Sequence, residues 1–163
     1  LLGALASTAW TSTTSANVQD LANLAWAFAK LRGCDDSLFA HLVERALQAE
    51  SLGTVMHPKH ISNFLWALAK VHIENQHLIH CLCEHAISNI TRFSAGELSS
   101  AVWAVAALAA LHCPLVDAVE EHVLRDRGLT WRPQHVANMF WAYATMKLCD
   151  ASVLTRLQQV AME

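Results

Sequence analysis

Glycine, proline and charge are all scarce in this sequence. The chain of 163 residues contains 5 glycines and 3 prolines, and 15% of its residues are charged while 54% are hydrophobic. Such a composition excludes a disordered chain, which needs low hydrophobicity and high net charge. Alanine and leucine dominate the apolar residues, and the β-branched residues form no alternating runs. We therefore expect an all-α protein.

Long hydrophobic runs are also lacking. The longest one is the stretch "AVWAVAALAAL" between Ala101 and Leu111. It is far shorter than the roughly 20 apolar residues that a membrane-spanning helix needs. The sequence therefore predicts no membrane insertion.

Catalytic motifs are missing as well. The chain contains no glycine-rich phosphate loop, no G-x-S-x-G and no H-E-x-x-H. Its 10 histidines are spread along the chain, and His85 and His122 share one repeat position, as structural residues would. We therefore expect no enzyme and no cofactor.

The 5 cysteines do not have the spacing of a disulfide scaffold. This usage is typical of reduced packing residues in an intracellular or organellar compartment. A metal site could be assembled within one helix from His77, His80, Cys81, Cys83 and His85. The segment has no Cys-x-x-Cys pair and fits an ordinary amphipathic helix, so we expect no metal there.

What the sequence does contain is a repeat. Tryptophan recurs at intervals of 37 to 40 residues, each time followed by alanine, at Trp26, Trp66, Trp103 and Trp141. Tandem helical repeats have this kind of period. In each unit a second apolar segment begins about 12 residues after the tryptophan and continues four residues later, which is helical spacing. Each unit is therefore predicted to be a helix, a short turn and a second helix.

The predicted architecture is an α-solenoid of about four helix-turn-helix repeats, 17–56, 57–93, 94–131 and 132–163. Residues 1–16 are interpreted as the end of a preceding repeat or an irregular N-terminal segment. First helices are predicted at 17–32, 57–72, 94–111 and 132–148, and second helices at 35–50, 74–88, 113–126 and 150–163. Each first helix has two apolar stripes, so we expect its tryptophan to be packed in the core rather than available for base stacking.

A narrow polar ridge is left on each first helix after these stripes. It comprises four repeat positions: Asp20, His60, Glu97 and His135; Asn23, Asn63, Ser100 and Asn138; Ala27, Ala67, Ala104 and Ala142; and Lys30, Lys70, Ala107 and Thr145. At some of these positions the residue type is the same in most units, and at others it varies. This pattern is typical of a modular RNA-binding protein, in which each repeat reads one base with two or three side chains. The alternative is that the asparagines cap or hydrogen-bond within the protein and the varied position is merely solvated.

The charges are unevenly distributed along the repeats. Basic residues are concentrated in the predicted first helices, and acidic residues in the second helices. First helices usually line one surface of a solenoid. We therefore expect one positive surface, suited to a phosphate backbone, and an acidic surface opposite it.

The repeated core "LANLAWAFAKL", echoed by "ISNFLWALAKV" and "VANMFWAYATM", resembles the octotricopeptide repeat family. Related helical arrays occur beside RAP domains and in FAST-kinase-like proteins. The resemblance covers residues 17–163, and the third unit departs from it at Ser100 and Ala107. It implies an organellar protein, in the mitochondrion or chloroplast, that binds single-stranded RNA or rRNA along its first helices.

The resemblance carries over a set of candidate RNA-binding residues, with the two lysines near phosphates: Asp20, Asn23, Lys30, His60, Asn63, Lys70, Glu97, Ser100, His135 and Asn138. The alternative function is a structural scaffold subunit of a large organellar assembly, for example a ribosome. Such a subunit would act through contacts with other proteins of the complex.

Overall fold

The described part of the chain is all-α. The computed structural model describes residues 13, 16–31, 36–51, 56–109, 114–125 and 128–162. The α-helices within these ranges are α2 (Val18–Leu31), α3 (Asp36–Ser51), α4 (Pro58–Val71), α5 (Gln76–Ser88), α6 (Ala95–Ala107), α7 (Pro114–Arg125), α8 (Pro133–Met146) and α9 (Ala151–Met162), and a short 3-10 helix, η1, spans Ile90–Arg92. Each predicted helix is present. The segment 1–16 falls almost entirely outside the described residues.

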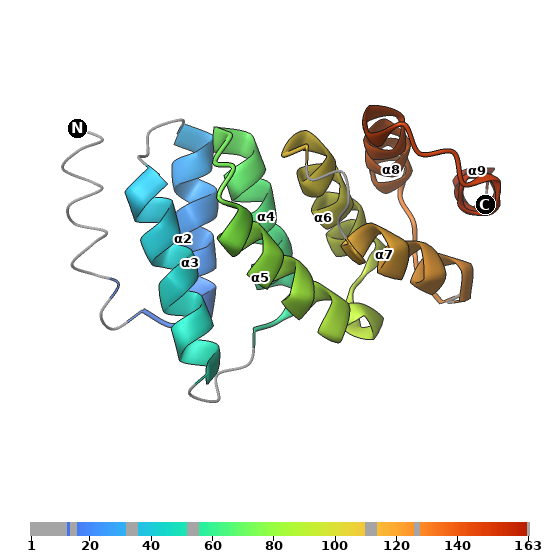
Figure 1. Ribbon diagram of the computed structural model, residues 1–163. Helices are drawn as coiled ribbons and strands as arrows, with labels where there is room; N and C mark the ends of the chain where they lie inside the picture. The colour runs from blue at the N-terminus through green and yellow to red at the C-terminus, as the bar shows by residue number, and fades with distance from the viewer. Residues whose placement is uncertain are drawn as a thin grey trace.

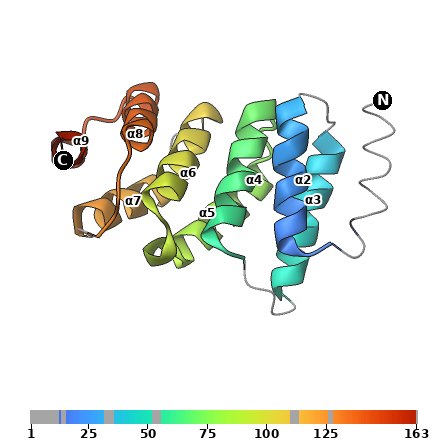
Figure 2. The same cartoon turned by 180° about the vertical axis from the view of Figure 1, so that it is seen from behind.

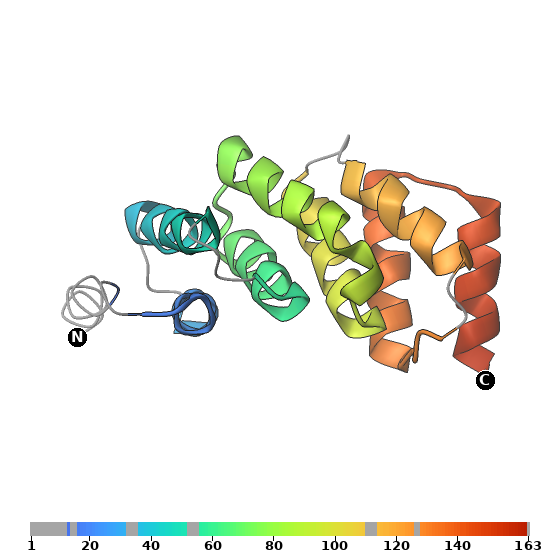
Figure 3. The ribbon, with the colours of Figure 1, turned by 90° about the horizontal axis from the view of Figure 1, so that it is seen from below.

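The helices pack as successive pairs. α2 packs on α3, α4 on α5, α6 on α7 and α8 on α9, and the first helices of the pairs pack directly one after another (Figures 1 and 2). The second helices contact one another less closely. Figure 3 shows α3, α5 and α7 on one side of the row of first helices. The first helices therefore form the closely packed layer of the molecule.

Small residues make this close packing possible. The first helices are lined by alanines that are almost completely buried: Ala22, Ala25, Ala29, Ala67, Ala69, Ala101, Ala104 and Ala142. Larger side chains of the same helices are also buried, among them Leu21, Ile61 and Leu98. Because alanine has only a β-carbon, two helix backbones can approach closely where it lies between them.

Local signals set the ends of the first helices. Pro58 and Pro133 begin α4 and α8, where the missing N–H would have no partner in any case. At the other end, His72 and Lys147 have the left-handed conformation, with φ of 58° and 57°. The next residues donate back into the helix, from Ile73 N to Leu68 O and from Leu148 N to Tyr143 O, which closes each helix.

The predicted boundary of the third first helix is wrong. α6 ends at Ala107 rather than at residue 111. Ala109 follows it with a φ of 52°, at the same repeat position as His72 and Lys147. The apolar run continues past this point, so composition alone did not show where the helix stops. No described helix is long and apolar enough to cross a membrane.

Candidate functional site

The four repeated tryptophans lie at the border between the core and the surface, so their predicted place in the core is wrong for Trp26 and Trp141 and holds only in part for Trp66 and Trp103. Trp26 is 43% exposed and Trp141 46% exposed, while Trp66 and Trp103 are partly buried. The alanine that follows each tryptophan was placed on the outward ridge, but Ala67, Ala104 and Ala142 are 0% exposed. Ala27, on the first described helix, is exposed.

Helix geometry allows either residue of the dipeptide to lie on the ridge. Successive residues turn by about 100°, so a residue three or four positions away is within about 60° on the same face. Trp66 is three residues after Asn63 and four before Lys70, both of which are on the accessible side of α4. Ala67 is four residues after Asn63 and three before Lys70, so the same geometry would fit it equally well. In the structure the indole stays partly accessible and the alanine is fully buried.

The tryptophan row, Trp26, Trp66, Trp103 and Trp141, consists of two contacting pairs. The ring centroids of Trp26 and Trp66 are 6.3 Å apart with the planes inclined at 33°, and those of Trp103 and Trp141 are 5.7 Å apart at 34°. Lys30 Nζ is 5.3 Å from the centroid of Trp26 and 5.3 Å from that of Trp66. This lysine therefore makes cation–π contacts with both rings of the first pair.

The two pairs do not contact each other. No ring contact joins Trp66 to Trp103 in the part of the chain described. Instead both indoles line a central groove of about 420 Å³, together with Lys70, Gly96, Ser100, Gln134, His135 and Asn138. An added side-chain carbon at Gly96 would be 3.1 Å from His135 Nε2. The absence of a side chain at Gly96 thus leaves room for the imidazole of the next unit.

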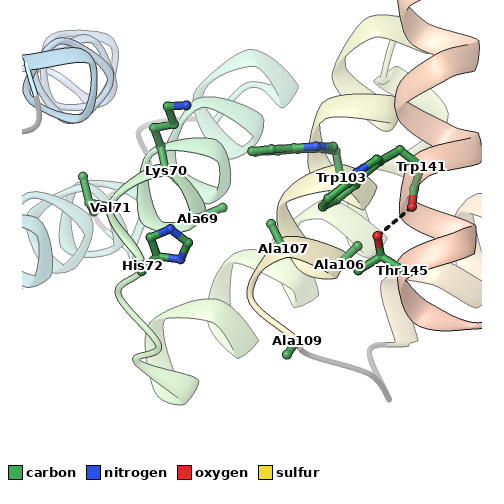
Figure 4. Close-up of a pocket in the computed structure, with 10 residues that line it drawn as sticks. All are labelled: Ala69, Lys70, Val71, His72, Trp103, Ala106, Ala107, Ala109, Trp141 and Thr145. Atoms are coloured by element: carbon green, nitrogen blue, oxygen red, sulfur yellow. Dashed lines mark hydrogen bonds between the residues drawn. The ribbon is translucent and has the colours of Figure 1, made fainter.

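A second depression lies at the other end of the same helices. This alanine pocket has a volume of about 750 Å³, and Figure 4 shows Trp103 and Trp141 lying against each other beside it. Its lining comprises Ala69, Lys70, Val71, His72, Trp103, Ala106, Ala107, Ala109, Trp141 and Thr145. Thr145 Oγ1 donates to Trp141 O. Lys70 and Trp103 line both depressions, so the open surface continues on either side of them.

The repeated amide and hydroxyl groups are accessible. Asn23 is exposed, and Asn63, Ser100 and Asn138 are partly buried. None of these four side chains makes a hydrogen bond to any residue that the structure describes. The alternative for the asparagines was that they cap a helix or hydrogen-bond within the protein. The described residues offer them no such bond. Each amide can still donate and accept hydrogen bonds.

The four candidate RNA-binding residues at the ridge position that varies between units, by contrast, cap the first helices. Each one accepts a hydrogen bond from the backbone N–H three residues earlier: Asp20 Oδ2 from Asn17 (3.2 Å), His60 Nδ1 from His57 (3.4 Å), Glu97 Oε2 from Ser94 (2.9 Å) and His135 Nδ1 from Arg132 (3.3 Å). Carboxylate and neutral imidazole can both fill this accepting role. The structure thus accounts for the variation at this position without a ligand.

Burial and neighbouring charge lower the pKa of both capping histidines, which favours the neutral imidazole. The pKa of His60 is lowered by burial and by His57 and Lys59, against the opposing effect of Glu97. The pKa of His135 is lowered by burial and by Arg132. A neutral ring can accept at Nδ1, as both hydrogen bonds require.

Several cationic side chains are exposed on the first helices or at their ends, and two of them, Lys30 and Lys70, lie beside the tryptophan row. Lys30, Lys59 and Lys70 are exposed on α2 and α4, and Arg132 and Lys147 are exposed at the two ends of α8. The acidic residues of the same helices, Asp20 and Glu97, accept the cap hydrogen bonds described above. The five exposed cations outnumber these two acidic residues, so the first helices and their ends carry an excess of basic side chains, although the chain as a whole has a net charge of −3.

The histidine and cysteine residues of α5 do not form a metal centre. His77 and Cys81 are neighbours on one helical face, with Sγ 3.9 Å from Nε2. No group of three or more histidine, cysteine or acidic side chains comes together anywhere in the described residues.

Comparison with known proteins gave no assignment. No protein-family model matches the chain, and no curated protein matches its sequence.

Proposed function

We propose that this chain is an α-solenoid module of about four repeats that binds single-stranded RNA along the surface of its first helices. The observation that carries the proposal is the tryptophan row, which is exposed at Trp26 and Trp141 and remains partly accessible at Trp66 and Trp103. Bases of single-stranded RNA stack on accessible aromatic rings, and each such contact contributes about 1–3 kcal/mol. Tryptophans that served the core alone would be fully buried in every unit, as Ala67, Ala104 and Ala142 are.

The polar groups beside the row support the same function. Asn63, Ser100 and Asn138 supply hydrogen-bonding groups with no partner in the described structure. Lys70 lies between the two depressions, where it can contact phosphate. The resemblance to octotricopeptide repeats favours RNA independently, and with it a location in the mitochondrion or chloroplast. In this proposal Asp20, His60, Glu97 and His135 shape the helix ends and do not read bases.

Binding to short single-stranded RNA across a salt series tests the proposal. The dissociation constant, measured by fluorescence anisotropy, should rise with salt because phosphate contacts release counterions. Lys70→Ala should lower the salt slope by about one, and Asn63→Ala should weaken binding with the slope unchanged. Arg125→Ala is the matched control, since Arg125 is an exposed cation on the second helix α7 that pairs with Glu121.

Undetectable binding, or equal losses in Lys70→Ala and Arg125→Ala, would refute an RNA surface on the first helices. The chain would then fit the alternative role of a scaffold subunit that contacts other proteins of a large assembly.

A further inference from the structure

The tryptophan row is interrupted at one step only, between α4 and α6. On either side of that step the indoles already touch, with centroids 6.3 Å and 5.7 Å apart. Trp66 is paired with Trp26, and Trp103 with Trp141, so each has an aromatic neighbour on the side away from the central groove. Both indoles then line the groove between them. A planar ring placed there would continue the row of aromatic contacts.

The other residues of the groove match the edge of a nucleobase. Asn138 offers an amide and Ser100 a hydroxyl, and neither is hydrogen-bonded to any described residue. An asparagine amide can pair with two adjacent groups of a base, as it does with adenine. Lys70 is exposed beside the groove, in a position to contact the phosphate of an inserted nucleotide and to repel a cationic ligand.

We propose that the central groove binds one unstacked RNA base, inserted between Trp66 and Trp103, with its edge on Asn138 and Ser100. This site rests on the proposed RNA-binding function and narrows it. The protein would bind one base by insertion rather than one base in every repeat, because the rings of the other two neighbouring pairs, Trp26–Trp66 and Trp103–Trp141, are already in contact. Lys30 also covers the first of those pairs.

The test compares two strands of equal charge: octaadenylate RNA and an eight-unit ribose-phosphate strand that has no bases. Tryptophan fluorescence and anisotropy would report binding of each. We expect octaadenylate to quench the fluorescence and to bind at least tenfold more tightly than the abasic strand. Trp66→Leu and Trp103→Leu should each weaken octaadenylate binding about tenfold or more, the size of a lost stacking contact. They should leave binding of the abasic strand unchanged.

Two further variants separate the groove from a general aromatic surface. Trp26→Leu removes another accessible indole of the same row, outside the groove, and should weaken octaadenylate binding less than Trp66→Leu or Trp103→Leu does. Ser100→Met keeps all four tryptophans and fills the groove with a flexible side chain, so it should weaken octaadenylate binding as strongly as Trp103→Leu. Circular dichroism would confirm that each variant remains helical.

Equal binding of the two strands, equal losses in Trp26→Leu and Trp103→Leu, or unchanged octaadenylate binding in Ser100→Met would overturn the base site. If RNA binding remained salt-dependent and sensitive to Lys70→Ala in those cases, the RNA surface would stand without this site. If neither strand bound, both proposals would fail.

Discussion

At the scale of single residues, the repeated tryptophan and the alanine after it have different roles. The alanine is buried where the next helix approaches, as Ala67 and Ala104 show, and the indole beside it stays partly accessible. A large side chain in the alanine's place would hold the two backbones apart. The repeat therefore preserves the dipeptide for two reasons, close helix packing and an aromatic surface.

A second residue-scale feature is the hydrogen bond that joins α8 to α7. Tyr143, which is almost completely buried, donates from its hydroxyl to Glu120 Oε1 at 2.8 Å. Burial raises the pKa of Glu120, the hydrogen bond from Tyr143 lowers it, and Asp150 and Asp117 raise it further. The folded state therefore binds the Glu120 proton more tightly than the unfolded state does.

We predict that this carboxyl makes stability depend on pH. Its stabilising contribution is complete below the unfolded pKa of about 4.5 and is lost as the pH rises through the raised folded pKa. Glu120→Gln keeps an accepting oxygen without titrating, so its free energy of unfolding should fall less than that of the wild type as the pH rises from about 4.5. Urea denaturation at several pH values measures the difference.

The matched comparison is Glu120→Ala, which removes the acceptor and leaves the Tyr143 hydroxyl without its partner. It should cost about 1–3 kcal/mol at neutral pH. If Glu120→Gln shows the same pH dependence as the wild type, the Glu120 carboxyl does not control it.

At the scale of elements, the first helices share one type of N-terminal cap. A side chain three residues into each segment accepts from the backbone N–H that begins it, and the four units use Asp20, His60, Glu97 and His135 for this purpose. Two of these four acceptors are histidines with lowered pKa values. The caps of α4 and α8 therefore depend on neutral imidazole.

We predict that α4 and α8 lose this stabilisation in mild acid. The pKa values of His60 and His135 are lowered in the folded state. Their contribution to the stability of the folded protein is therefore complete above the unfolded pKa of 6.5 and is lost as the pH falls through the folded pKa. His135→Gln provides a non-titrating acceptor of the capping-box type. Its melting temperature should fall less than that of the wild type between about pH 7 and pH 5, as followed by circular dichroism.

His80→Gln is the control for this experiment, because His80 is an exposed histidine on the second helix α5. It should lose as much stability in acid as the wild type. A flattened pH profile in the control, or none in His135→Gln, would show that the cap is not the cause.

At the scale of the whole molecule, the closeness of the first helices arranges the surface. Because they pack directly on one another while the second helices contact less, the tryptophans of neighbouring units come within contact distance. The same packing brings Trp103 and Trp141 together, and Ala104, the residue after Trp103, is fully buried. Helix spacing and indole pairing should therefore change together.

We predict that Ala104→Leu disturbs both. Overpacking a fully buried position costs about 1–3 kcal/mol, and pushing α6 away from a neighbour should also alter the Trp103–Trp141 pair. Thermal unfolding measures the first effect, and near-ultraviolet circular dichroism of tryptophan measures the second.

Ala27→Leu is the control, since Ala27 occupies the same repeat position but is exposed. Its stability should remain within about 0.5 kcal/mol of the wild type. Equal destabilisation by the two substitutions would contradict the account of close packing through alanine.

Much of the fold follows from the sequence read alone. The helices, their order and the buried positions represented by Leu21, Ile61 and Leu98 follow from a repeated apolar pattern, because burying one helix face requires a regular period. The existence of the polar ridge at Asn23, Asn63 and Asn138 follows from the same period. The left-handed end of α6 at Ala109 does not, because the apolar pattern continues beyond it.

Only the tertiary structure decided which of the two residues, the tryptophan or the alanine after it, lies on the ridge. The period of a single helix cannot tell whether a neighbour packs on Trp66 or on Ala67, since the two are adjacent on its circumference. Only the distance between neighbouring helices resolves this, and it favours the smaller side chain inside. The capping role of His60 and His135 and the open step between Trp66 and Trp103 likewise depend on groups from separate turns or separate helices, whose relative positions appear only once the chain is folded.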